Sequence, residues 1–273
     1  MNLLATVRRI FLIWATLFVA RTVAGAILPF QAPAPENMLP WFLAAYFLIA
    51  VGIAVLVTRS NWQRWQNSVA ACAILLAIEL INMIEGIVFL NLHIWGRLLG
   101  QLVIFYAILA PLWMLILPKV KGETTTPDYG SLLVPSGRFW RFLLSDLAYL
   151  LFYFTAGTII FPFVRNYYAS LGLPSTAQIV SLQFLVRGPL FIGVCLLLTR
   201  MLRMTGALGW LTTGAVFAVV SGIALIIPNP YFPDSVRWVH FWEVSSSNFL
   251  FAVFVSWLWT VPRPKALPAA QAA

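Results

Sequence analysis

Residues 40–58 read PWFLAAYFLIAVGIAVLVT, a run of nineteen positions without one charged side chain. A helix that crosses a bilayer needs about 20 consecutive, mostly apolar residues, so this run is long enough to span. A membrane β-barrel would alternate polar and apolar side chains, whereas this run is apolar on every face. The stretch therefore predicts a transmembrane α-helix.

The same pattern recurs along the whole chain of 273 residues. The hydrophobic fraction is 62% and the charged fraction 9%, whereas soluble domains carry about 25% charged residues. A soluble fold could not cover its surface with so few charges. We therefore predict an all-α integral membrane protein with about eight transmembrane helices. The expected spans are residues 10–29, 40–58, 68–90, 96–117, 142–163, 178–199, 207–227 and 240–260.

The net charge of +9 comes from basic residues that stand singly or in pairs between the apolar runs. They form no basic stripe, so we interpret them as a topology signal and expect no nucleic-acid partner. With the N-terminus inside, twelve basic residues are cytoplasmic and three are external, which predicts cytoplasmic termini in a bacterial-type inner or plasma membrane. The twelve are Arg8, Arg9, Arg59, Arg64, Lys119, Lys121, Arg138, Arg141, Arg200, Arg203, Arg263 and Lys265, and the three are Arg97, Arg165 and Arg237.

Three short matches relate the first four expected helices to the last four. Their offsets of 132, 141 and 147 residues rise steadily, as loop insertions would require. Such self-similarity is typical of internal repeats, although chance matches are the alternative in so apolar a chain. The matches are Ala24-Gly25 with Ala156-Gly157, Thr58-Arg59 with Thr199-Arg200, and His93-Ile94-Trp95 with His240-Phe241-Trp242.

A repeat of four crossings returns the chain to the side where it began, so the two halves would be parallel. We therefore expect a tandem parallel repeat of two four-helix halves. The first half would be residues 1–117 and the second residues 142–260. A cytoplasmic linker, 118–141, would join them, and a disordered tail, 261–273, would follow.

Polar side chains inside a bilayer are costly, so each one is a candidate for function. Arg21 and Arg187 lie halfway through the first and sixth expected helices, and Glu79 and Glu85 share the third. We expect arginine–glutamate pairing, although the sequence leaves open which partners meet. The same residues also fit a structural role as clamps between helices. The candidates for ligand binding or gating are Arg21, Glu79, Asn82, Glu85, Gln183, Arg187, Glu243 and Asn248.

The remaining titratable residues give weaker signals. His93 and His240, the only histidines, occupy matching repeat positions and could together hold a haem or a metal ion. Histidines of an interfacial belt are the simpler interpretation, so we predict no metal and no cofactor. Asp146 is expected to be hydrated near the inner interface. Cys72 and Cys195 lie in apolar runs without a metal-binding spacing.

The sequence contains no H-E-x-x-H, G-x-S-x-G or phosphate-loop pattern, which disfavours an enzyme. We predict a protein that binds or transports a small solute or lipid head group, anionic because of the two arginines. The site would be an outward-facing polar cavity between the halves. A non-catalytic subunit or sensor that acts through a partner membrane protein is the alternative. A membrane-embedded haem protein or enzyme is a further one.

Overall fold

A computed structural model describes residues 3–29, 35–90, 95–117, 135–172, 174–204 and 206–260. Within these ranges the chain is helical and contains no β-strand, so the predicted all-α class is confirmed. The first half contributes α1 (Leu3–Ile27), α2 (Met38–Arg59), α3 (Arg64–Leu90) and α4 (Trp95–Ile116). The second contributes α5 (Pro135–Leu171), α6 (Thr176–Leu182), the π-helical turn η2 (Gln183–Arg187), α7 (Gly188–Leu202), α8 (Gly206–Gly222), the 3-10 turn η3 (Ile223–Ile226) and α9 (Asp234–Thr260).

Seven helices in the described part of the chain are long and apolar enough to cross a membrane. They indicate an integral, multi-pass membrane protein in a lipid bilayer. The helix α9 has 27 residues but is not among them, because polar side chains fill its N-terminal half. The seven are Leu3–Ile27, Met38–Arg59, Arg64–Phe89, Gly96–Ile116, Gly137–Leu171, Thr176–Leu202 and Gly206–Ile226.

Two helices extend well beyond the apolar runs that predicted them. The helix α1 begins at Leu3 rather than at residue 10, and α5 has 37 residues with Pro162 inside it. Residues 135–141, expected in the linker, therefore belong to α5. Apolar runs mark only the part of a helix that faces hydrocarbon, whereas basic and interfacial residues can continue the same helix. The rest of the expected linker and the expected tail lie outside the described residues.

The sixth expected span is interrupted by the wide turn η2. Pro189 follows it after one residue, Gly188, and a proline has no backbone N–H to donate to the preceding turn. Gly188 lies against α5, where a Cβ atom would collide with the Asp146 carboxylate. Asp146 is 2% exposed, so the expectation that it is hydrated was wrong. The close contact between α5 and α7 at Gly188 buries it.

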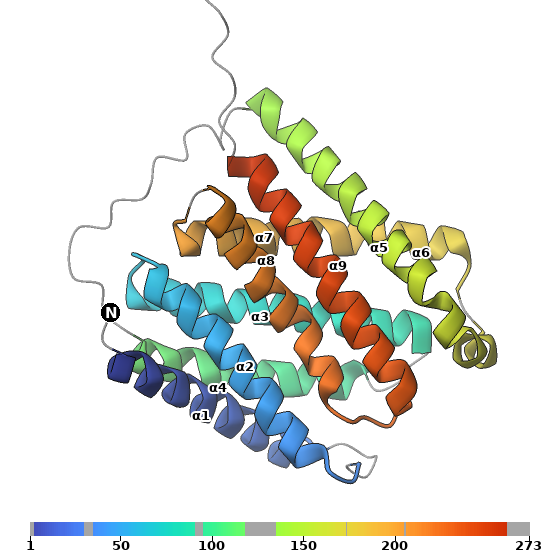
Figure 1. The fold of residues 1–273 in the computed structure, drawn as a ribbon. Coiled ribbons are helices and arrows are strands. Elements are labelled where there is room, and N and C mark those ends of the chain that lie inside the picture. The colour runs from blue at the N-terminus through green and yellow to red at the C-terminus, as the bar shows by residue number, and fades with distance from the viewer. Residues whose placement is uncertain are drawn as a thin grey trace, which may run out of the picture.

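The two halves meet through their second and third helices. In the first half α1 packs against α2 and α4, and α3 packs against α4. In the second, α5 packs against α7 and α9, and α8 packs against α9; Figure 1 shows α5 and α9 running side by side. Helices α2 and α3 contact α7 and α8, which joins the halves. The hydrophobic core is continuous across this junction.

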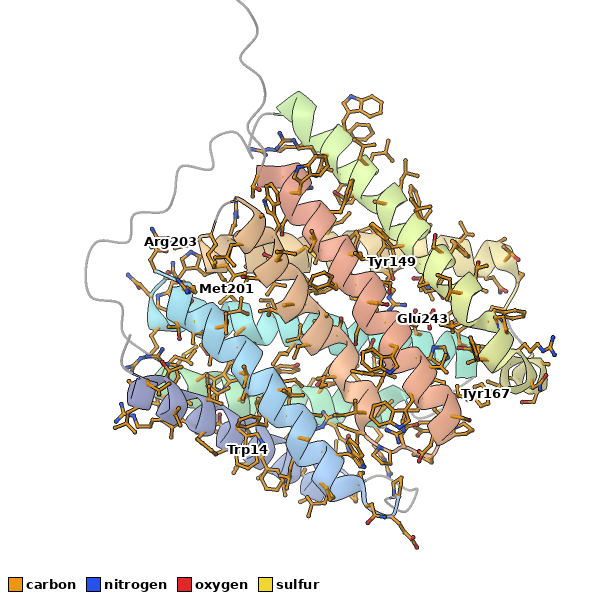
Figure 2. The ribbon with its side chains drawn as sticks, in the orientation of Figure 1. Trp14, Tyr149, Tyr167, Met201, Arg203 and Glu243 are labelled. Atoms are coloured by element: carbon orange, nitrogen blue, oxygen red, sulfur yellow. The ribbon has the colours of Figure 1, made fainter. Side chains whose placement is uncertain are left out.

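The helix ends gather at two opposite edges of the bundle. At the edge that we name the basic edge, Arg9 donates to Thr58 (2.6 Å) and the Arg141 guanidinium donates to the Trp259 carbonyl (3.2 Å). At the opposite edge the Tyr167 hydroxyl donates to the Tyr231 carbonyl (2.6 Å). Figure 2 shows Arg203 at the basic edge and Tyr167 at the other. Successive helices thus run in alternating directions between the two edges.

Candidate functional site

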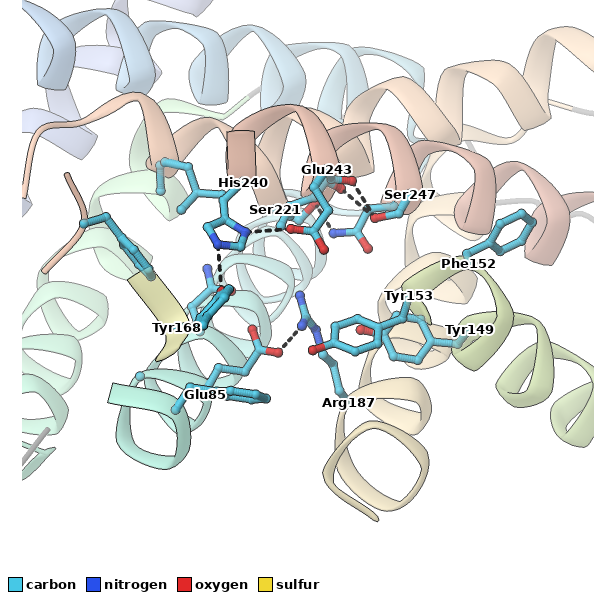
Figure 3. A pocket seen from close by; sticks show the side chains of 18 residues that line it. Glu85, Tyr149, Phe152, Tyr153, Tyr168, Arg187, Ser221, His240, Glu243 and Ser247 are labelled. Carbon is cyan, nitrogen blue, oxygen red and sulfur yellow. Dashed lines mark hydrogen bonds and ion pairs between the residues drawn. The ribbon is translucent and has the colours of Figure 1, made fainter. Parts of the chain in front are cut away.

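A cavity of about 300 Å³ lies between α3 and the second half of the chain. It brings together five of the eight candidate residues and one of the two histidines. Gln183 lies directly behind the wall, and Arg21 and Glu79 lie elsewhere. The predicted residues that line it are Asn82, Glu85, Arg187, His240, Glu243 and Asn248. Figure 3 shows the labelled side chains of α3, α5, η2, α8 and α9 converging on this space.

Arg187 forms an ion pair with Glu85, which joins the two halves of the chain. The Arg187 side chain is 6% exposed, and its guanidinium lies 5.1 Å from the ring centre of Phe191 and 5.7 Å from that of Tyr153. Gln183, one turn earlier, donates to the same Glu85 oxygen at 3.3 Å. An ion pair with ring faces around its cation offsets part of the cost of burying the charge.

A chain of three hydrogen-bonded side chains lies across the cavity from that pair. The hydroxyl of Tyr168 lies 2.7 Å from Nε2 of His240, and Nδ1 of His240 lies 2.6 Å from Oε2 of Glu243 (Figure 3). The residues of α9 are three positions apart, which places them on one face of the helix. A carboxylate accepts from Nδ1–H, so Glu243 favours the tautomer whose Nε2 accepts from Tyr168. The arrangement can pass a proton between a phenol, an imidazole and a carboxylate.

Small polar residues close the end of the cavity toward the basic edge. Asn248 is 3% exposed and donates to the Ser221 hydroxyl of α8 at 2.9 Å. Ser247 also lines the cavity and donates to the backbone carbonyl of Glu243 at 2.7 Å. These bonds satisfy the side chains within the protein, so the wall keeps its shape without a ligand.

Arg21 and Glu79 form a separate pair within the first half. Arg21 Nη1 and Glu79 Oε2 are 3.8 Å apart, and the two side chains are 25% and 29% exposed. The Arg21 guanidinium lies 5.5 Å from the centre of the Phe105 ring, and Tyr46 and Tyr106 lie beside the pair. The structure thus answers which arginine meets which glutamate. It does not bring Arg21 and Glu79 into the cavity.

Metal binding has little geometric basis in the described part of the chain. No group of three or more His, Cys, Asp or Glu residues that could hold an ion occurs there. Both ring nitrogens of His240 already have hydrogen-bond partners. His93, its partner in the suggested haem or metal pair, lies outside the described residues.

Sequence reasoning missed several residues that form the wall. Tyr168 was not considered because the fifth helix was expected to end at residue 163, whereas α5 continues to Leu171. Tyr149 and Tyr153 lie one turn apart, and their spacing predicts a shared face of the helix, but it does not indicate that this face meets Arg187. Ser221 has no such signal, because one serine in an apolar helix is common.

Comparison of the chain with protein-family models, with curated proteins and with solved structures gives no match. The cavity geometry therefore carries the functional argument.

Proposed function

We propose that the protein binds a small solute or lipid head group in the cavity and carries it across the membrane. The observation that supports this is the number of polar side chains that line one space inside an apolar bundle. Polar groups at membrane depth are costly and commonly mark a ligand pathway. One ion pair would suffice to hold α3 against η2, whereas His240, Glu243, Asn82 and Asn248 add polarity that such a structural pair does not need.

The proposal includes eight crossings, with α9 as the eighth. Its 27 residues are enough to cross a bilayer. Its packing against α5 and α8 supports a crossing antiparallel to α8. Four of its polar residues line the cavity and lower its hydropathy, namely His240, Glu243, Ser247 and Asn248. The excess of basic residues supports a cytoplasmic position for the basic edge and for both termini. The cavity, near the ends of α3 and α5 and the beginning of α9, then opens outward.

Helix neighbours support the proposed parallel repeat. The pairs of first with second, first with fourth and third with fourth helices occur in both halves, and the second and third helices form the junction from both sides. The offset of 132 relates Arg21 to Tyr153, and the offset of 141 relates Tyr46 to Arg187. At these two related positions each half therefore has one arginine and one tyrosine, with the two residues exchanged between its first and second helices.

A cavity-filling variant tests the proposal. The thermal stability of the purified protein is measured with a panel of small amines, carboxylates, sugars and soluble lipid head groups. We expect one class to raise the unfolding temperature, because a ligand at 100 times its Kd stabilises the folded state by about 2.7 kcal/mol. Ser247→Trp should abolish this increase, whereas Ser246→Trp, on the exposed neighbour, should retain it.

A panel without any stabilising class, or an increase that survives Ser247→Trp, would contradict ligand binding in this cavity. Transport is tested on the same protein in vesicles, where uptake of the stabilising class should be lost in Ser247→Trp. Binding without uptake would favour a sensor or subunit that acts through a partner.

A second candidate function follows from the Tyr168–His240–Glu243 chain. A hydroxyl, a base within hydrogen-bond reach and a carboxylate that orients the base are the groups of an acid–base or nucleophilic catalyst. Mass spectrometry of the bound ligand after incubation distinguishes the two. A transporter releases the ligand unchanged, whereas an enzyme yields a product that disappears in His240→Gln.

A further inference from the structure

We infer that the cavity selects a small organic ammonium group rather than an anion, an inference that rests on the proposed binding function. The first observation is the balance of charge among the lining residues. Two carboxylates, Glu85 and Glu243, face one guanidinium, Arg187. Arg187 is already paired with Glu85, and Tyr153 and Phe191 lie around its guanidinium. An anionic ligand would have to displace Glu85 from this site.

Glu243 is the acid that remains for a ligand. Within the described ranges, His240 is the only side chain hydrogen-bonded to its carboxylate, through Oε2. Its other oxygen, Oε1, points toward Gly157 of α5, where even an added Cβ would stay 3.8 Å away. The Glu243 carboxylate itself lines the cavity, and it is not engaged by the Arg187–Glu85 pair. A cation placed there gains a counterion without breaking the Arg187–Glu85 pair.

Aromatic rings form much of the remaining wall. Arg187 already lies near the rings of Tyr149 and Tyr153, which leaves four other lining rings for a ligand. The face of an aromatic ring is negative and attracts cations. Proteins commonly bind quaternary ammonium groups in cages of such rings. The four rings are Phe89, Phe152, Tyr168 and Phe232.

The size of the cavity restricts the ligand further. A volume of about 300 Å³ is at the lower end of ligand pockets, which range from about 300 to 1,000 Å³. It suits a compact head such as a choline or ethanolamine group. Asn82 and Ser247 also line the cavity and can hydrogen-bond a hydroxyl or ester oxygen next to the ammonium. The same chemistry is available from a free amino alcohol or from a lipid head group.

Matched isosteres test the inference on the intact protein in detergent. Choline is compared with the neutral 3,3-dimethylbutan-1-ol and the anionic 3,3-dimethylbutanoate by calorimetric titration. We expect choline to bind at least about tenfold more tightly than either, because only the cation interacts with Glu243 and the ring faces. Two short-chain lipids then distinguish a free amino alcohol from a lipid head group as the ligand. If phosphatidylcholine binds more tightly than choline, and phosphatidylglycerol does not, the ligand is a lipid head group.

Two variants connect the selectivity to the wall. Glu243→Gln should weaken choline binding about tenfold and leave the neutral alcohol unchanged, whereas Asp234→Asn, at an exposed acid of the same helix, should change neither. Phe152→Leu should weaken choline binding about threefold. Tighter binding of 3,3-dimethylbutanoate than of choline would overturn the ammonium inference but preserve the proposed function. Failure of every probe and of the wider panel would overturn both.

Discussion

The Arg21–Glu79 pair of the first half and the Arg187–Glu85 pair of the cavity combine the same side chains in different surroundings. In the first half the closest charged atoms are 3.8 Å apart, both side chains are about a quarter exposed, and Arg21 Nη1 and Glu79 Oε2 have no hydrogen-bond partner. In the cavity Arg187 is 6% exposed and contacts Glu85 directly, and Gln183 adds a further bond to the same carboxylate.

The difference shows that an intramembrane arginine does not by itself make a site. Each half contributes one such arginine, and α3 of the first half supplies both of the glutamates that pair with them. The cavity arises in the second half because α9 presents His240, Glu243 and Asn248 toward it. At the position that matches Asn248 in the first half, Gln101 instead donates to the carbonyl of Leu28 and fastens α4 to the end of α1.

The largest expected effect separates the two arginines. Arg187→Leu should lower the free energy of unfolding by about 3–5 kcal/mol, because it leaves Glu85 without its buried partner. Arg21→Leu should cost less, because that pair is looser, with 3.8 Å between its closest charged atoms. Thermal or denaturant unfolding in detergent measures both. The double variant Arg187→Leu, Glu85→Leu should recover much of the stability that Arg187→Leu loses. If Arg187→Leu and Arg21→Leu lower the free energy of unfolding equally, the two ion pairs do not differ in the way proposed.

The close approach of α5 and α7 predicts the next effect. Gly188→Ala should destabilise the protein by about 1–3 kcal/mol, because the new methyl group would collide with Asp146 and force the helices apart. Gly193→Ala is the matched control on the same helix, since a Cβ there meets nothing within 4 Å. Unfolding curves of the two variants should therefore differ. Identical curves would contradict the packing around η2.

The smallest expected difference concerns the two amides at matching positions. Asn248→Leu and Gln101→Leu should each cost about 1–2 kcal/mol, because each removes a hydrogen bond that a buried amide donates. Only Asn248→Leu should also change ligand affinity, since Asn248 lines the cavity. Titration of both variants with the stabilising ligand checks this. An equal loss of affinity would show that the first half takes part in binding.

The sequence predicted the helices well because bilayer-spanning segments follow one rule of length and apolarity. The rule failed at the ends of α5, where interfacial residues continue the helix. It also does not establish α9 as a transmembrane span, because polar residues within α9 face the cavity. The turn η2 was also not predicted. Pro189 lies two residues beyond it, but a proline alone does not specify a π-helical turn.

Burial cost was the useful guide to the candidate site. It identified Glu85, Arg187, Glu243 and Asn248 before any contact was known, because an isolated polar residue in an apolar run requires a reason. It could not separate Arg21 and Glu79 from that group, since depth along a helix says nothing about which face meets which neighbour. The role of Tyr168 depends on the exact length of α5 and on its bond to His240, and neither is encoded in local pattern.

Accessibility of the cavity from one side of the membrane tests the central claim most directly. Ser247→Cys and Ala45→Cys are made in a chain in which Cys72 and Cys195, both buried, are replaced by alanine. Ser247 lines the cavity, and Ala45 is 0% exposed inside the first half. A membrane-impermeant thiol reagent added outside intact cells should modify Ser247→Cys and leave Ala45→Cys unmodified. Modification of Ser247→Cys only from the cytoplasmic side, or equal modification of both, would contradict an outward-facing cavity in the second half.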